Sequence, residues 1–287
     1  MMRKALGTLA AAMVTTGAQA QITPDKEYYG FRRAMPMTVS VPAGMDAEGA
    51  SIALLQAASA EVVGSAPVSP GRVDLAALFP SLWERGETPV VYAQLMVGEE
   101  RVGPAVVLVP MNNPRLAALD ATGRIRWQST GVTYAGIRAY VDQDVVFETT
   151  LGEIRVRMRP DHAPNTVKHI MGLVEGGFYV DIIFHRIVPF SGPQRLPFVI
   201  QAGDPVGIGS GGPGSFTDLE QSTLPHDFGV ISMARTNEPN TNGSQFFLCL
   251  SREGTSFLDN QYCSFGETIE EGDVIRAIAA VRIDERD

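Results

Sequence analysis

The first half of the chain alternates apolar and polar residues in short runs that are separated by proline and glycine. Met37, Val39 and Val41 alternate with polar neighbours, and the same alternation extends over Val91–Val97. A period of two is typical of strands that bury one face of a sheet, and runs at this spacing are typical of antiparallel sandwiches. We therefore predict a small β-sandwich domain of immunoglobulin-like type over residues 21–111. It contains no cluster of His, Cys or carboxylate residues that would carry chemistry.

A second β-rich domain is predicted over residues 142–287, after a linker at residues 112–141. The linker holds a short segment, Arg115–Leu119, whose pattern suggests a helix. Within the second domain, apolar residues recur at helical spacing between Pro164 and Gly176, and again between Glu271 and Ala279. Periodicity alone thus predicts strands with two amphipathic helices, which is a mixed but mainly β domain.

The first twenty residues have the order of a secretory signal peptide. Basic residues in Met1–Lys4 precede an apolar stretch, Ala5–Val14, and the small-residue triplet Ala18–Ala20 follows. We expect cleavage near Ala20 and an exported protein, periplasmic or secreted; a frayed amphipathic helix is the alternative. No later stretch approaches the roughly 20 apolar residues that span a bilayer, so no transmembrane segment is expected.

Composition narrows the function classes further. Of 287 residues, 45% are hydrophobic and 19% are charged, as is usual for a globular protein. The net charge of −9, without any basic run, argues against a nucleic-acid partner, because phosphate binding requires clustered Lys and Arg. Two cysteines are too few for a disulfide scaffold or a zinc site, and we expect Cys249 to be a buried, inert thiol. No metal site is predicted, since four histidines lack ligand spacing: His162, His169, His185 and His226.

The most informative stretch is Gly229–Leu248, which reads as a buried strand, a turn-rich loop and a second buried strand. Asn, Pro and Gly crowd the loop from Asn237 to Gly243, and these residues favour turns. The apolar pattern resumes at once after the loop. We therefore expect a stiff scaffold that brings Gln245 and Phe247 to one place.

This stretch also carries a family resemblance. Met233-Ala234 followed by Asn240–Phe247 resembles the signature of the cyclophilin peptidyl-prolyl isomerases, and two earlier motifs, Phe184–Ile187 and Phe198–Asp204, are similar to another central motif of that family. The resemblance covers roughly the last half of the chain. It implies an eight-stranded closed β-barrel with two capping helices, peptidyl-prolyl isomerase activity without a cofactor, and proline-containing peptides and unfolded proteins as partners.

The chemistry that the resemblance implies needs neither a nucleophile nor a metal. Rotation about a peptide bond has a barrier of about 18–20 kcal/mol, because resonance gives the C–N bond double-bond character. A catalyst must hold the proline ring in an apolar pocket and place a donor near the prolyl nitrogen. By resemblance, Arg186 is this donor. The implied catalytic residues are Arg186, Phe198, Gln201 and Phe247, and the implied substrate-binding residues are Val199, Met233, Ala234, Arg235, Gln245, Phe257, Leu258 and Tyr262.

The sequence departs from the family pattern in several places. Phe257 stands where many members carry tryptophan, so an indole N–H donor is missing, and Tyr262 stands where histidine is usual. Val199 replaces a typical methionine. The loop after Arg235 is one residue longer than the common pattern, and Pro189–Pro197 replaces a very short turn. We predict that this proline-rich insertion forms a stiff surface loop that walls one side of the substrate groove.

Two functions are compatible with these observations. The first is an exported prolyl isomerase that assists folding in the cell envelope, where slow isomerisation of X–Pro bonds limits folding. The second is a non-catalytic proline-peptide binding module or envelope chaperone. Arg186 favours the enzyme, whereas the departures at Phe257 and Tyr262 leave the alternative open.

Overall fold

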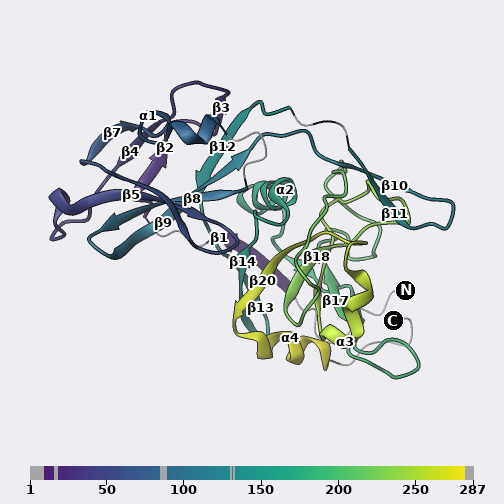
Figure 1. The fold of residues 1–287 in the computed structure, drawn as a ribbon. Coiled ribbons are helices and arrows are strands. Elements are labelled where there is room, and N and C mark those ends of the chain that lie inside the picture. Colours follow the sequence, from purple (N-terminus) through teal and green to yellow (C-terminus); the bar gives the residue numbers. More distant parts are fainter. Residues whose placement is uncertain (1–9, 16–18, 85–88, 130, 132, 282–287) are drawn as a thin grey trace. The chain divides into compact units, whose positions relative to one another are not determined.

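A computed structural model describes residues 10–15, 19–84, 89–129, 131 and 133–281. The chain divides into two compact units, which are interleaved along the sequence. Unit 1 combines residues 1–16, 115–129 and 144–287, and unit 2 combines residues 17–114 and 130–143. Figure 1 shows both units coloured along the chain.

Unit 2 contains a six-stranded sheet in the order β3-β12-β9-β8-β5-β6 and a three-stranded sheet in the order β2-β4-β7. All neighbouring strands are antiparallel. Side chains from both sheets share one core, which includes Met37, Ile52 and Leu95. The elements are β2 (Ile22–Pro24), β3 (Tyr28–Gly30), β4 (Pro36–Val39), η1 (Ala47–Gly49), β5 (Ala50–Gln56), β6 (Val62–Pro67), β7 (Gly71–Asp74), α1 (Leu75–Leu78), η2 (Pro80–Trp83), β8 (Val91–Val97), β9 (Glu100–Pro110) and β12 (Gly136–Val141).

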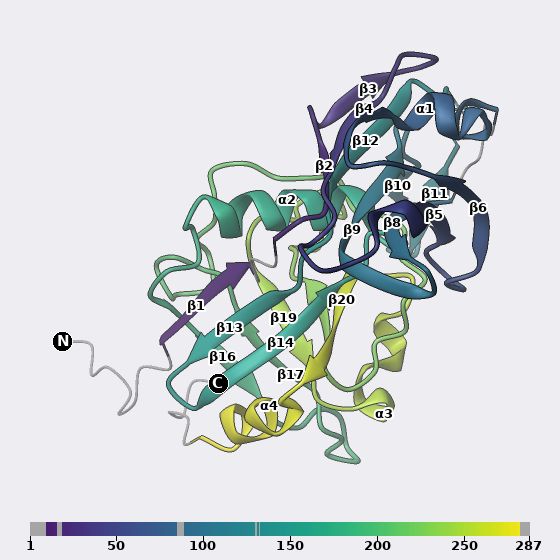
Figure 2. The same cartoon turned by 90° about the vertical axis from the view of Figure 1, so that its left-hand side faces the viewer.

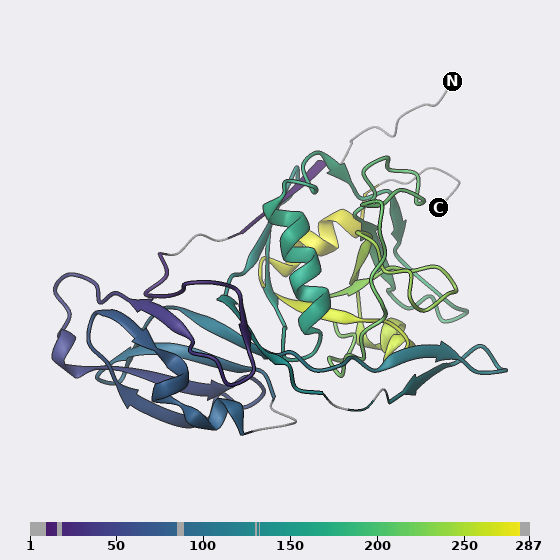
Figure 3. The same cartoon turned by 90° about the horizontal axis from the view of Figure 1, so that it is seen from above.

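The segment at residues 112–141, which we expected to be a linker, contributes to both units. Its end forms β12 in the large sheet of unit 2, and its start forms a hairpin in unit 1, β10 (Leu116–Leu119) and β11 (Ile125–Gln128). The prediction of a helix at Arg115–Leu119 is therefore wrong. The strand pairs with β11 in a hairpin (Figure 3), and Ala117 on this strand is buried in the main core of unit 1.

Unit 1 is built on one curled sheet of nine strands in the order β15-β1-β13-β14-β20-β18-β19-β17-β16 (Figure 2). The mainly β class is confirmed. The expected closed barrel had eight strands, whereas this sheet has nine, and no pairing in the described part of the chain joins its outer strands β15 and β16. The strands are β1 (Ala10–Thr15), β13 (Val145–Thr149), β14 (Gly152–Met158), β15 (Ile182–Ile183), β16 (Arg186–Val188), β17 (Val199–Ala202), β18 (Val230–Met233), β19 (Phe246–Cys249) and β20 (Ser264–Glu270).

Two amphipathic helices lie at opposite ends of the curled sheet, α2 (Pro164–Glu175) and α4 (Gly272–Ala279) (Figure 2). Both helix predictions are confirmed. Proline at the first position of α2 suits a helix start, because its fixed φ fits the helix and its missing N–H is not needed there. A single turn, α3 (Arg252–Thr255), continues directly into η3 (Ser256–Leu258).

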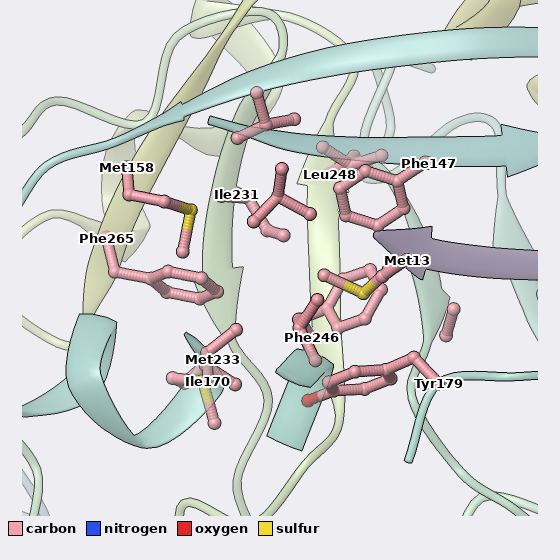
Figure 4. Close-up of a cluster of buried hydrophobic side chains, with 14 of the residues drawn as sticks. Met13, Phe147, Met158, Ile170, Tyr179, Ile231, Met233, Phe246, Leu248 and Phe265 are labelled. Carbon is pink, nitrogen blue, oxygen red and sulfur yellow. The ribbon is translucent and has the colours of Figure 1, made fainter. Parts of the chain in front are cut away.

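The main core of unit 1 lies between the sheet and α2. Alternate residues of β14 and β19 point into it, together with Ile170 of α2 and Tyr179 (Figure 4). Phe246 packs edge-on against both Phe147 and Tyr179, with ring centroids 5.4 and 5.8 Å away. This packing anchors the strands that carry the candidate site on their other face.

Part of the expected signal peptide is described as a strand. Residues 1–9 and 16–18 lie outside the described residues, but Ala10–Thr15 forms β1, which pairs antiparallel with β13 and briefly with β15. Met13 is buried beside Phe147 and Phe246 (Figure 4). Within the described ranges, no helix is both long and apolar enough to cross a membrane.

Candidate active site

Three neighbouring strands place three of the four predicted catalytic residues in one row, and Phe198 lies just before β17. Arg186 of β16 lies opposite Gln201 of β17, and Gln201 lies opposite Phe247 of β19. Because side chains in a paired row point to the same face of a sheet, the cation, the amide and the aromatic ring share one surface. Residues that are separated by 61 positions in sequence are thus adjacent through backbone pairing alone.

A chain of hydrogen bonds orients the polar members of this row. Arg186 Nη1 donates to Gln201 Oε1 at 3.2 Å, and Gln201 Nε2 donates to Gln245 Oε1 at 2.9 Å. Gln245 Nε2 then donates to the carbonyls of Gly209 and Gly211. The guanidinium of Arg186 is exposed, so its remaining donors face the solvent side of this row.

Apolar side chains next to the row form a separate cluster, which we call the site cluster. Its partly buried members include Phe198, which stacks on Phe257 with ring centroids 5.8 Å apart and an interplanar angle of 13°. Phe257 is 63% exposed, so the cluster reaches the surface at this ring pair. The site cluster consists of Val188, Phe198, Val199, Leu224, Val230, Ala234, Phe247, Cys249, Leu258 and Tyr262.

Six predicted site residues therefore lie together in the site cluster, and Phe257 adjoins it. Tyr262 meets Phe247 edge-on, with ring centroids 5.8 Å apart. Met233 differs from these residues, because its side chain is fully buried in the main core (Figure 4). Its neighbour Ala234 belongs to the site cluster and donates its N–H to the carbonyl of Gln245.

Arg235 stabilises its own loop. Its guanidinium donates to the carbonyls of Thr236, Asn237 and Gln261 and lies 4.6 Å from the ring centroid of Tyr262. An arginine that is bonded to three carbonyls has few donors left for a ligand. Its side chain thus fixes the edge of the site cluster beside Tyr262.

The glycine-rich loop beside Gln245 is folded around one carboxylate. Asp204, which is almost fully buried, accepts hydrogen bonds from the N–H groups of Val206, Ile208, Gly209 and Gly211. Burial alone would raise the pKa of Asp204, but these backbone donors outweigh burial and lower it. This tight surface loop presents the two carbonyls that orient Gln245.

The proline-rich insertion is a closed surface loop. Ser191 and Leu196 exchange two backbone hydrogen bonds across it, at 2.8 and 3.1 Å. The guanidinium of Arg195 lies 4.9 Å from the ring centroid of Phe190, which is exposed. The loop joins β16 to β17, so it begins and ends beside the row that carries Arg186.

Some residues of the site were missed from sequence. Cys249 lies two residues after Phe247 in β19, and strict alternation could have placed it on the same face. The expectation that it is a buried thiol is confirmed, and burial raises its pKa to about 12. Leu224 comes from an irregular loop, where no periodicity indicates which side chains turn inward.

The described residues include no group of three or more His, Cys, Asp or Glu side chains that could hold a metal ion. The donors of Arg186 and Gln201, next to the site cluster, can supply hydrogen bonding and electrostatic stabilisation beside an apolar contact area. A peptide amide next to a hydrophobic ring would suit it.

Comparison with known proteins identifies the family to which the second half of the chain is related. Residues 144–287 match the family model described as cyclophilin type peptidyl-prolyl cis-trans isomerase/CLD. The chain belongs to the cyclophilin-type peptidyl-prolyl cis-trans isomerases. The matched residues end the chain and contain all the site residues named above.

Curated cyclophilin relatives agree with this assignment. A peptidyl-prolyl cis-trans isomerase-like 1 of Emericella nidulans is 38% identical over 149 residues, which are 50% of this chain and 86% of the relative. A Schizosaccharomyces pombe peptidyl-prolyl cis-trans isomerase is 35% identical over 149 residues, again 50% of this chain and 90% of the relative. A crystal structure of a Cryptosporidium parvum cyclophilin type peptidyl-prolyl cis-trans isomerase matches with 31% identity and a TM-score of 0.43, covering 48% of this chain and 84% of that one.

Proposed function

We propose that unit 1 accelerates cis-trans isomerisation of X–Pro bonds by polarising the prolyl amide with Arg186. The observation that carries this proposal is the paired row of Arg186, Gln201 and Phe247, which sets a cation directly beside the site cluster. The substrate proline packs against the site cluster. The guanidinium then donates a hydrogen bond toward the prolyl nitrogen. The lone pair of this nitrogen withdraws from the amide resonance, and the C–N bond loses double-bond character.

The magnitudes required are modest. The uncatalysed barrier is about 18–20 kcal/mol, and each 1.4 kcal/mol removed from it is about tenfold in rate. A charge-assisted hydrogen bond that forms only when the nitrogen becomes pyramidal stabilises the transition state selectively. The bond from Arg186 to Gln201 holds the guanidinium in place before the substrate arrives.

A protease-coupled assay on a short Xaa-Pro peptide tests this role. We expect Arg186→Ala to abolish most of the acceleration and to leave the melting temperature unchanged, because Arg186 is exposed. Arg157→Ala is the matched control, since Arg157 is also exposed on this unit and pairs with Asp144 at 3.6 Å, away from the row of Arg186. Near wild-type turnover in Arg186→Ala would refute the assigned role.

We further infer that the protein works outside the cytoplasm on unfolded, proline-containing chains. The support is the basic, apolar and small-residue order of residues 1–20. Cleavage near Ala20 would remove β1, and with it Met13, from the sheet of unit 1. Mass spectrometry of the protein recovered from a bacterial periplasm should give a chain that starts at Gln21. Recovery of the uncleaved chain from the cytoplasm would contradict export.

The binding-module alternative rests on one observation, the exposed Phe257. A phenylalanine there offers a stacking surface with Phe198 but no N–H donor. A protein that used the site cluster only for binding would retain peptide affinity without accelerating exchange. The same peptide, measured by binding and by turnover, separates these two functions.

A further inference from the structure

A buried histidine lies directly behind the catalytic ring. His226 is 1% exposed, and its ring stacks on Phe247 with centroids 6.1 Å apart and an interplanar angle of 18°. Both ring nitrogens are engaged, Nδ1 with Asp259 Oδ1 at 2.9 Å and Nε2 with Ser232 Oγ at 3.0 Å. The Thr255 hydroxyl donates to its carbonyl at 2.6 Å. The imidazole is thus fixed at every polar atom.

The partners determine which nitrogen carries the proton. A carboxylate only accepts, so Nδ1–H donates to Asp259 and Nε2 accepts from the hydroxyl of Ser232. The backbone N–H of His226 donates to the same carboxylate oxygen at 3.0 Å, and Arg252 donates to the other one at 2.6 Å. This network holds the imidazole in one tautomer and one orientation.

His226 therefore connects three parts of the site. Asp259 directly follows Leu258, which belongs to the site cluster and ends η3. Ser232 lies opposite Phe247 in the pairing of β18 with β19. The imidazole itself supports the face of the Phe247 ring. Removing the imidazole would remove its contacts with Asp259 after η3, with Ser232 of β18 and with the ring of Phe247.

These three residue types also occur together in serine hydrolases, where the serine must reach its substrate. Ser232 is fully buried, so its hydroxyl has no access to one. We propose instead that His226 is a positioning residue, which holds the Phe247 ring and the Leu258 turn at the separation that a substrate proline requires. The inference rests on the proposed function of the site cluster.

Two substitutions and one matched control test the proposal. His226→Asn keeps a donor near Nδ1 but removes the ring and the contact with Ser232, whereas His226→Phe keeps a stacking ring without hydrogen bonds. His162→Asn is the control, because His162 is also hydrogen-bonded on both nitrogens, and its partners Arg159 and Thr223 are not members of the site cluster. All variants are assayed as full chains well below their melting temperatures, with 4-fluorophenylalanine at position 247 as a probe of the ring.

We expect both His226 variants to lower kcat/KM between about tenfold and a hundredfold and to shift or broaden the fluorine resonance, since small misplacements of contact groups have effects of this size. His162→Asn should lower the melting temperature while leaving kcat/KM and the resonance unchanged. Equal melting losses in all three variants, with kcat/KM and the resonance unaffected, would reduce His226 to a structural role. Labelling of wild-type Ser232 by a fluorophosphonate would also overturn the proposal. If the wild type itself shows no turnover, the proposed function fails, while the resonance and peptide affinity still report on His226.

Discussion

The strands β17, β18 and β19 each contribute one face to the main core and the other face to the site cluster. In β19, Phe246 and Leu248 point into the main core, whereas Phe247 and Cys249 belong to the site cluster. The same division holds in β17 and β18. One face is sealed by α2 and the rest of the sheet, and the other ends at exposed aromatic and polar groups. The residues of the main core and those of the proposed peptide site are therefore separated by a single residue step along each strand.

Because of this division, substitutions at the adjacent residues Phe246 and Phe247 should affect different properties of the protein. Phe246→Ala should destabilise the protein by about 3–5 kcal/mol, because it empties a packed position between Phe147 and Tyr179. Chemical denaturation followed by circular dichroism measures this loss. A loss below about 1 kcal/mol would mean that the main core does not depend on this ring.

Phe247→Ala should act mainly on catalysis. Its ring packs among the site cluster, so turnover on an Xaa-Pro peptide should fall at least tenfold, and stability should fall less than in Phe246→Ala. Comparing kcat/KM and unfolding free energy in the two variants tests the separation of the faces. A larger stability loss in Phe247→Ala than in Phe246→Ala would contradict it.

Acidification should lower the free energy of unfolding through the buried histidine His226. Desolvation lowers the pKa of His226, and of His162, below the usual value of 6.5. The unfolded state therefore binds more protons than the folded state. The contribution of each histidine to the free energy of unfolding is fully present above about pH 6.5. It decreases as the pH falls below that value, by at most about 1.4 kcal/mol per pH unit for each histidine. Urea unfolding at pH 8, 6 and 5 measures the slope. His226→Phe should show a smaller decrease, and an unchanged slope would contradict this assignment.

Phe257→Trp should sharpen the exposed end of the site cluster. It keeps an aromatic surface for Phe198 and adds an N–H donor, which is worth about 0.5–1.5 kcal/mol when it finds a peptide carbonyl. Titration calorimetry with a proline peptide should show affinity that is about two- to tenfold higher. Equal affinities would show that the indole donor has no partner at this position.

The smallest effect is expected from the proline-rich insertion. Replacing residues 190–196 by a tight turn should leave turnover on a tetrapeptide unchanged and alter the preference among longer peptides by about two- to threefold, because only longer peptides reach the exposed Phe190. Turnover on a panel of both peptide lengths measures this change. Identical preferences in the two proteins would leave the loop without a role in substrate selection.

The sequence predicted those parts of the molecule that depend on local periodicity and on matched motifs. The helices at Pro164–Glu175 and Gly272–Ala279 follow from apolar spacing. Met233 was predicted to bind substrate because it lies in the family motif, but its side chain is in the main core. It lies two residues after Ile231 in β18, so alternation places both side chains in the main core, while their neighbour Ser232 faces the other way.

Other features depend on contacts that no short stretch encodes. Arg115–Leu119 suggests a helix by composition, but a partner strand and the burial of Ala117 in unit 1 make it a strand, because tertiary packing overrides weak propensity. His226 could not be assigned to the site from its neighbours. Its proposed role depends on Asp259, which is 33 residues away and lies at the C-terminal cap of η3.

We propose that the face of β16, β17 and β19 that carries Arg186, Gln201 and Phe247 catalyses cis-trans exchange at a prolyl bond. The most direct measurement is exchange spectroscopy by NMR on an Xaa-Pro peptide at equilibrium, with catalytic amounts of wild type or of Arg186→Ala. Cross-peaks between the cis and trans forms of the peptide report catalysis, and broadening of the same resonances by the protein reports binding. We predict exchange peaks with wild type that vanish with Arg186→Ala, while the peptide still binds. Binding without exchange peaks in the wild type, or equal exchange in both proteins, would contradict the account.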